Sequence, residues 1–178
     1  NEEKYVRQAL KSTWISDGSC IKNFEKRFCS YVSSRFAISV TNGTTALHLV
    51  YLAMGLKRGD EIIVPGFGYM AAANIALQMG IKPVFADVDP ETFCVTAENI
   101  KKKINSKTKL IVVIHTYGNM CDLNSIIKIA KKKNIPVLED SAESFGSKYE
   151  GRQSGGIADI GTFSFQATKT ITTGEGGM

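Results

Sequence analysis

One lysine near the end of the chain stands among residues that could support covalent chemistry. Lys169 lies in the stretch SFQATKTITTGEGGM, residues 164–178, where most neighbours are small, hydroxylated or glycine. A lysine amine can attack a carbonyl group and form a Schiff base when apolar or cationic surroundings favour its neutral form. A solvated surface lysine is the other interpretation. The glycines do not form a Walker-type phosphate loop, because that motif places its lysine after the glycines.

An acidic residue ends one of the apolar runs of the sequence. Asp140 follows IPVLE, with Glu139 beside it and Glu143 three residues further on. A carboxylate in a buried setting needs a partner, either a helix N-terminus or a cation such as a protonated ring nitrogen. Acidic residues at strand ends also bind Mg²⁺. The spacing leaves both interpretations open.

Two further segments could contact a ligand. The turn TNGTTA, residues 41–46, leads directly into a helical pattern, and the free N–H groups at a helix start can bind an anion. An ordinary N-cap by Asn42 or Thr44 explains the same residues. The segment GFGY, residues 66–69, puts two aromatic residues on a flexible loop. A ring there could stack on a planar ligand or pack in the core.

Short β-rich runs alternate with helical patterns along most of the chain. The expected strands cover residues 36–40, 61–65, 82–88, 109–118, 135–142 and 159–165, and the expected helices cover residues 44–56, 69–80, 96–104 and 122–134. This alternation predicts an α/β fold, in which a mostly parallel sheet lies between helices. Ligands of such folds gather at the carboxyl ends of the strands, so the residues that follow each strand are those expected to bind or react.

The composition is that of an ordinary globular protein with a basic balance. The 178 residues carry a net charge of +5, but the lysines at 101–103 and 131–133 lie in helical patterns without interleaved aromatic residues. We therefore expect solvated helix faces and no nucleic-acid partner. Attraction of a phosphorylated substrate is a weaker alternative.

Cysteine spacing and hydropathy indicate the compartment. Four widely spaced cysteines form no C-x-x-C pair, which favours neither a zinc site nor a disulfide framework. No apolar run approaches the roughly 20 residues needed to span a bilayer, and the start NEEKYVRQAL is unlike a signal peptide. We expect a cytoplasmic protein with no membrane association. Because Asn1 is not an initiator methionine and Met178 follows a glycine cluster, we also expect a piece of a longer protein.

Six stretches, in this order, resemble one enzyme family. They are TNGTTALHL, PGFGYMAAANIA, VIHTYGNMCDL, LEDSAESFGSKYEG, GGIADIGTFSF and KTITTGEGG. From about STWIS at Ser12 to its last residue, the sequence resembles the sugar aminotransferases related to DegT, DnrJ, EryC and StrS. The resemblance implies the fold of aspartate aminotransferase (fold type I) and the cofactor pyridoxal 5′-phosphate (PLP). It also implies that residues 1–178 are the N-terminal part of the PLP-binding large domain, with the C-terminal small domain absent from this chain.

The resemblance assigns roles to the candidate residues around the cofactor ring. Lys169 matches the lysine that forms a Schiff base with PLP and then moves a proton between substrate and cofactor. Asp140 matches the carboxylate that pairs with the pyridinium nitrogen, which disfavours a metal at this position. Tyr69 matches the aromatic residue that stacks on the ring. Glu143 stands where relatives carry Gln, His or Glu near the phenolic oxygen, and an acid there needs a proton or a donor.

The resemblance also assigns a phosphate site. Gly43 and Thr44 match the backbone and hydroxyl donors to the phosphate, and Ser164 matches a further hydroxyl donor. Together with Lys169 and Asp140, these residues would hold the whole cofactor.

The implied reaction moves an amino group from an amino acid, in most relatives glutamate, to a keto group of a nucleotide-linked sugar. The stretches EDSAESFGSKYEG and KTITTGEGGM are similar to those of the perosamine-forming members, which aminate C4 of a GDP-linked 4-keto-6-deoxymannose. Such products enter surface polysaccharides and glycoconjugates, including the O-antigen of lipopolysaccharide. The resemblance further implies a homodimer with shared active sites in the full-length protein, and we expect the isolated piece to be inactive.

Two alternative functions remain. A non-catalytic binding or regulatory protein could keep the same fold, although such a protein would not need both Lys169 and Asp140. A PLP-dependent sugar dehydratase is the other alternative. The related 3-dehydratases carry histidine in place of the lysine, so Lys169 favours transamination.

Overall fold

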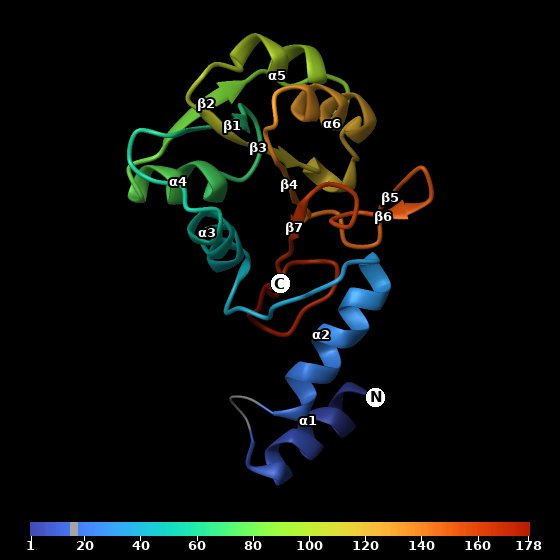
Figure 1. Ribbon diagram of the computed structural model, residues 1–178. Coiled ribbons are helices and arrows are strands. Elements are labelled where there is room, and N and C mark those ends of the chain that lie inside the picture. The colour runs from blue at the N-terminus through green and yellow to red at the C-terminus, as the bar shows by residue number, and fades with distance from the viewer. Residues whose placement is uncertain (15–17) are drawn as a thin grey trace. The chain divides into compact units, whose positions relative to one another are not determined.

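The computed structural model describes residues 1–14 and 18–178, which form two compact units, Asn1–Ser39 and Val40–Met178. The first unit consists of two helices, α1 (Glu2–Ser12) and α2 (Ser19–Val32) (Figure 1). Two residues of the STWIS stretch, Ile15 and Ser16, lie outside the described residues. All seven candidate site residues belong to the second unit.

The second unit is built on a five-stranded parallel sheet. Its strands are β1 (Glu61–Pro65), β2 (Lys82–Ala86), β3 (Thr108–Ile114), β4 (Val137–Asp140) and β7 (Ile160–Thr162). Their order across the sheet is β2-β1-β3-β4-β7, and every neighbouring pair is parallel. A small antiparallel hairpin is formed by β5 (Lys148–Tyr149) and β6 (Arg152–Gln153). The predicted α/β fold with a parallel sheet is confirmed.

Helices cover both faces of this sheet (Figure 1). One hydrophobic core joins α3 (Gly43–Ala53) and α4 (Ala71–Gln78) to alternate strand residues such as Ile62. The other core joins α5 (Ala97–Lys103) and α6 (Leu123–Lys132) to the residues between them, such as Ile63. Successive strand side chains point to opposite faces, so a strand buried on both faces needs an unbroken apolar run. The run EIIVP meets this requirement, since all five of its residues are buried.

Polar side chains set the starts of three of these helices. Asn42 accepts a hydrogen bond from the N–H of Thr45 at 2.8 Å. Thr96 caps α5 in the same way, through the N–H of Asn99 at 3.2 Å. Asp122 caps α6. Each bond satisfies one of the N–H groups that the first helical turn leaves free. All four predicted helices are present, with ends within a few residues of the predicted ones.

The strand predicted at residues 36–40 is wrong. Only Val40 pairs, through an isolated antiparallel bridge to Gly177. Phe36 and Ile38 are 72% and 60% exposed. An extended segment becomes a strand only where a neighbouring backbone completes its hydrogen bonds. Here the neighbouring backbone pairs at one residue, Gly177. The strand predicted at 159–165 is shortened for a related reason, because beyond Thr162 the chain makes only isolated bridges.

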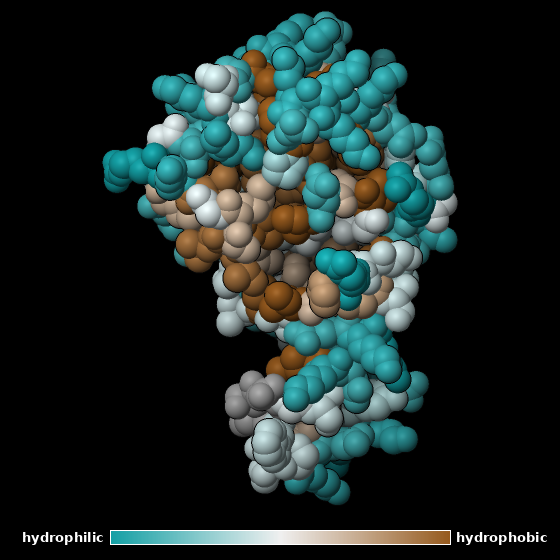
Figure 2. Space-filling model, in the orientation of Figure 1, coloured by the Kyte–Doolittle hydropathy of each residue, from teal (hydrophilic) through white to brown (hydrophobic). Residues whose placement is uncertain are grey.

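Hydrophilic and hydrophobic side chains separate on the surface of this unit. Figure 2 shows hydrophilic side chains over the region of α5 and α6, and hydrophobic ones gathered toward α3 and α4. The lysines at 131–133 are all exposed, as expected for a solvated helix face. No helix in the described part of the chain is long and apolar enough to cross a membrane.

Candidate functional site

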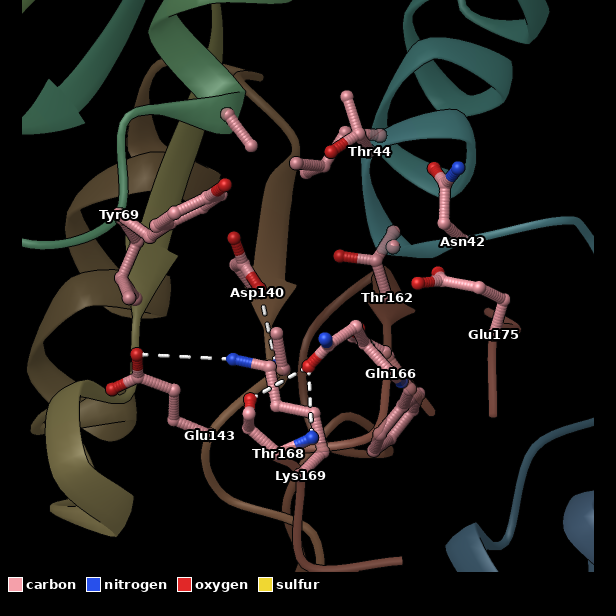
Figure 3. Close-up of a pocket in the computed structure, with 17 residues that line it drawn as sticks. Asn42, Thr44, Tyr69, Asp140, Glu143, Thr162, Gln166, Thr168, Lys169 and Glu175 are labelled. Carbon is pink, nitrogen blue, oxygen red and sulfur yellow. Dashed lines mark hydrogen bonds and ion pairs between the residues drawn. The ribbon is translucent and has the colours of Figure 1, made fainter. Parts of the chain in front are cut away.

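A cavity of about 410 Å³ lies at the carboxyl ends of β4 and β7, beside the first turn of α3 (Figure 3). This is the sheet edge where ligands of α/β folds bind. All seven predicted residues line it: Gly43, Thr44, Tyr69, Asp140, Glu143, Ser164 and Lys169. Residues separated by up to 126 positions in the chain therefore meet at one place, while their chemical roles stay predictions.

The first turn of α3 presents free donors to the cavity. Asn42 satisfies the N–H of Thr45 with its side chain, and its carbonyl oxygen accepts from Ala46 at 3.1 Å. Within the described residues, the N–H groups of Gly43 and Thr44 have no hydrogen-bond partner. The helix dipole adds partial positive charge at this end. The turn is therefore both an ordinary N-cap and an anion site, the two interpretations that the sequence left open.

Gly43 is required by a close approach of two segments. A β-carbon at Gly43 would lie 2.9 Å from the β-carbon of Ser164 and 3.4 Å from the carbonyl oxygen of Phe163. A larger residue at position 43 would push apart the helix start and the segment after β7. The side chain of Ser164 thus lies beside the start of α3.

Asp140 is the last residue of β4 and is 6% exposed. Its Oδ1 accepts a hydrogen bond from the N–H of Ala142 at 3.1 Å, and no other hydrogen bond to this carboxylate is found among the described residues. Burial raises the pKa of Asp140 to about 6, and the Ala142 N–H and the charge of Lys169 lower it only in part. A buried carboxylate with one donor is incompletely compensated, so a cationic ligand next to it would be stabilised.

Lys169 extends into the cavity toward Glu143 (Figure 3). Its Nζ lies 4.0 Å from Oε1 of Glu143, and the two side chains are 22% and 28% exposed. The other carboxylate oxygen of Glu143 accepts from the N–H of Tyr117 at 2.9 Å. Tyr117 has a positive φ of 55°, a conformation that costs a non-glycine residue free energy. The end of β3 is thereby tied to the acid that faces the lysine.

Tyr69 follows β1 and remains largely free. Its side chain is 71% exposed and lines the cavity, so the ring is available for stacking. The other aromatic residue of the same loop, Phe67, packs against Phe93 with ring centroids 5.3 Å apart and also contacts Tyr117. The loop therefore gives one ring to the cavity and one to a neighbouring aromatic cluster.

Sequence reasoning missed several residues of this region. Thr162, Gln166, Thr168 and Glu175 also line the cavity. Gln166 and Thr168 follow the same strand as Lys169, so the rule about strand ends could have found them. Glu175 comes close only through the fold of the glycine-rich segment, for which the sequence gives no signal. No group of three or more His, Cys, Asp or Glu residues in the described ranges could hold a metal ion.

A sequence profile of the DegT/DnrJ/EryC1/StrS aminotransferase family matches residues 1–178. The chain belongs to this family. A family relative, GDP-perosamine synthase of Escherichia coli O157:H7, is 48% identical over a match of 178 positions that covers 99% of this chain and 49% of the relative. The predicted family is confirmed.

Solved structures agree with this assignment. A Streptococcus pneumoniae protein described as a sugar aminotransferase, in its PLP form, is 32% identical with a TM-score of 0.95, and the match covers 99% of this chain and 49% of that one. The E. coli GDP-4-keto-6-deoxy-D-mannose-3-dehydratase with bound hydrated PLP is also 32% identical, with a TM-score of 0.93 and coverage of 99% and 47%. The chain spans about half the length of the family members it matches.

Proposed function

We propose that the full-length protein is a PLP-dependent aminotransferase that makes an amino sugar. The donor would be an amino acid, with glutamate the first candidate, and the acceptor a GDP-linked 4-keto-6-deoxy sugar. Membership of the family and the 48% identity to a GDP-perosamine synthase support the substrate class. The observation that carries the proposal is the convergence on one cavity of the Lys169 amine, the buried Asp140 carboxylate and the free amides of α3.

The donor set of the cavity fits a phosphate group. Two N–H groups, those of Gly43 and Thr44, have no partner among the described residues, and the hydroxyls of Thr44 and Ser164 line the same cavity. Helix N-termini of this kind bind phosphate through amides and dipole together. The close approach of Gly43 to Ser164 brings these donors to one side of the cavity.

The opposite side fits a cationic aromatic ring. Asp140 is buried with a raised pKa of about 6, and a pyridinium nitrogen would add a positive charge beside it. Such a partner would stabilise the ionised carboxylate, because an opposite charge favours the charged form. The exposed ring of Tyr69 would cover one face of the cofactor by stacking.

Each residue of the site would have its own role toward the bound cofactor. When bound, PLP supplies a conjugated ring that takes up the electron pair released at the substrate carbon. Asp140 would hold the proton on the ring nitrogen. Lys169 would anchor the cofactor and would carry the proton at its Nζ. Glu143, 4.0 Å from this Nζ, keeps the amine directed toward the cavity while the Tyr117 N–H holds the acid in place.

The wider assignments follow from the same membership. We infer that residues 1–178 are the N-terminal part of a PLP-binding large domain, and that the full-length enzyme is a homodimer whose subunits share active sites. A cytoplasmic enzyme that supplies amino sugars for surface polysaccharide such as O-antigen would fit the relatives in this family.

The test uses the full-length protein loaded with PLP. Incubation with glutamate and GDP-4-keto-6-deoxymannose should yield a GDP-linked amino sugar, identified by mass spectrometry. Borohydride treatment should fix the cofactor onto the peptide that contains Lys169. A Lys169→Ala protein that still forms the reducible linkage would show that the assignment of this lysine is wrong.

The same assay separates transamination from dehydration. A dehydratase product would contain no nitrogen introduced from glutamate, whereas an aminotransferase product would carry it from a ¹⁵N-labelled donor. Lys169, in place of the histidine of the related dehydratases, supports transamination. If no turnover occurs in a cofactor-loaded dimer with any keto-sugar, the protein has a binding function instead.

A further inference from the structure

Two buried polar residues lie behind the cavity, on the opposite face of β4 from Asp140. His115, which follows β3, and Glu139 of β4 both have fully buried side chains. His115 Nε2 lies 3.0 Å from Oε2 of Glu139. Neither residue lines the cavity, and the function proposed above gives neither of them a task.

The hydrogen bonds define the protonation of the imidazole. The backbone N–H of Cys121 donates to Nδ1 of His115 at 3.2 Å, so Nδ1 must carry a lone pair. The ring hydrogen is therefore on Nε2, from which it is donated to Glu139. His115 is a neutral ring whose two nitrogens are both engaged, and its orientation is fixed by both bonds.

Glu139 is an anion surrounded by donors. Its Oε2 accepts from His115 and from the N–H of Gly155 at 2.9 Å, while its Oε1 accepts from Ile157 at 2.8 Å and Ala158 at 2.7 Å. Burial raises the pKa of Glu139, but the bonds from His115 and the backbone amides outweigh it, and the pKa is lowered. Both oxygens have two donors each, so the carboxylate is fully engaged.

These contacts join three segments that lead into the cavity. His115 belongs to the end of β3, Glu139 to β4, and the three amides to the loop at 155–158 that precedes β7. A β-carbon at Gly155 would collide with the ring of Phe163, and Gly155 has a φ of +77°. The loop at Gly155 therefore packs closely against Phe163, the neighbour of Ser164. The β4–β7 ladder pairs Asp140 with Thr162, and the Glu139 carboxylate adds a second tie between β4 and the loop that leads into β7.

We propose that the His115–Glu139 pair is the positioning element of the cofactor site. By holding the 155–158 loop against β4, it fixes Asp140, which would contact the cofactor ring nitrogen, relative to Ser164, which would contact the phosphate. The inference rests on the proposed PLP site, whose two ends it aligns. An apolar pair could fill the same core volume at lower desolvation cost, but it could not hold three backbone amides.

Two matched substitutions separate the two bonds of the imidazole. In His115→Gln, the side-chain amide can donate to Glu139 from about the position of Nε2 but leaves Cys121 without an acceptor. In His115→Asn, the amide oxygen replaces Nδ1 as the acceptor for Cys121, but nothing donates to Glu139. Both variants are neutral, so they differ in which hydrogen bond they keep.

Three measurements on the full-length protein compare the two variants with wild type. Visible circular dichroism of bound PLP reports how firmly the cofactor is oriented, titration gives its dissociation constant, and hydrogen exchange of the 155–158 amides is read without cofactor. We expect His115→Gln to stay near wild type in all three. In His115→Asn we expect a reduced dichroic signal, faster exchange, and binding weaker by roughly tenfold to a hundredfold, the range for a hydrogen bond to a charged group.

The outcomes are distinct. Equal dichroism and affinity in the two variants would overturn the proposal, as would a folded His115→Gln protein with weakened cofactor binding. If His115→Asn does not fold, the His115→Gln protein alone decides, because the proposal requires it to behave as wild type. Wild-type protein that binds no PLP would refute the proposed function, whereas unchanged exchange at residues 155–158 in His115→Asn would refute the positioning role by itself.

Discussion

Replacing Asp140 by asparagine should stabilise the cofactor-free protein while removing its function. The carboxyl group is 6% exposed and its pKa is raised to about 6 from an ordinary 3.8 by burial. Asparagine has nearly the same shape and can keep the bond that Oδ1 accepts from Ala142, but it carries no charge at any pH. The substitution therefore removes the cost of burying an anion and leaves the packing almost unchanged.

The size and sign of the effect follow from proton linkage. A pKa raised by roughly two units corresponds to roughly 3 kcal/mol of destabilisation once the group is ionised in both the folded and unfolded states. Between about pH 4 and 6 the folded state binds more protons than the unfolded state, so the wild type loses stability as the pH rises. Below this window the penalty is absent, and above it the penalty is complete. Asp140→Asn should thus exceed wild type by up to roughly 3 kcal/mol near pH 7 and by little near pH 4.

The assay is urea unfolding of full-length, cofactor-free wild type and variant from pH 4 to pH 8, with the difference in unfolding free energy plotted against pH. Glu175→Gln is a matched control, since Glu175 lines the same cavity and its replacement leaves Asp140 intact. Its difference from wild type should therefore show no change between pH 4 and 6 that comes from Asp140. Adding PLP should reverse the order, because only wild type can pair with the ring nitrogen. A difference that does not change with pH would refute the reasoning.

Three smaller changes test the rest of the site. Ser164→Ala should weaken PLP binding by roughly tenfold without lowering thermal stability, because within the described residues its hydroxyl accepts only one long bond, 3.5 Å, from the backbone N–H of Gln166. Equal affinity by titration would contradict the phosphate role. Glu143→Gln keeps an acceptor for Tyr117 and loses the charge facing the lysine, so we expect lower kcat with little change in unfolding free energy, under about 1 kcal/mol for such a partly exposed pair at 4.0 Å. Asn42→Ala removes the bond to Thr45 and should cost about 1 kcal/mol in urea unfolding.

The sequence was sufficient for elements whose pattern is local. The run EIIVP and the Asn42 cap define a strand and a helix start from neighbouring residues alone, and both appear as predicted. The stretch at 36–40 has an equally strand-like composition but forms no strand, because a strand depends on a partner backbone that composition does not reveal. Only Val40 found such a partner.

Lys169 and Asp140 became candidates because both follow a strand of a predicted parallel sheet. That rule identifies an edge of the sheet, and the cavity lies there. It does not say which residues on the reverse side support the site. His115 and Glu139 are near the ends of two predicted strands, so their positions could be predicted from the sequence. Their hydrogen bond could not, because it depends on the register of β3 and β4 and on the path of a distant loop.

Glu139 and Asp140 show most clearly where local information ends. The two acids are adjacent in the sequence, are both buried, and differ by one methylene group. Yet the pKa of Glu139 is lowered and that of Asp140 is raised. The alternation of the strand sends them to opposite faces, where Glu139 meets four donors and Asp140 meets a single amide. The charge of Glu139 is thus stabilised by hydrogen bonds within the fold, and that of Asp140 is left to be stabilised by a ligand. The donors around Glu139 come from residues up to 24 positions away, so only the folded chain decides which carboxylate is structural and which is free to bind.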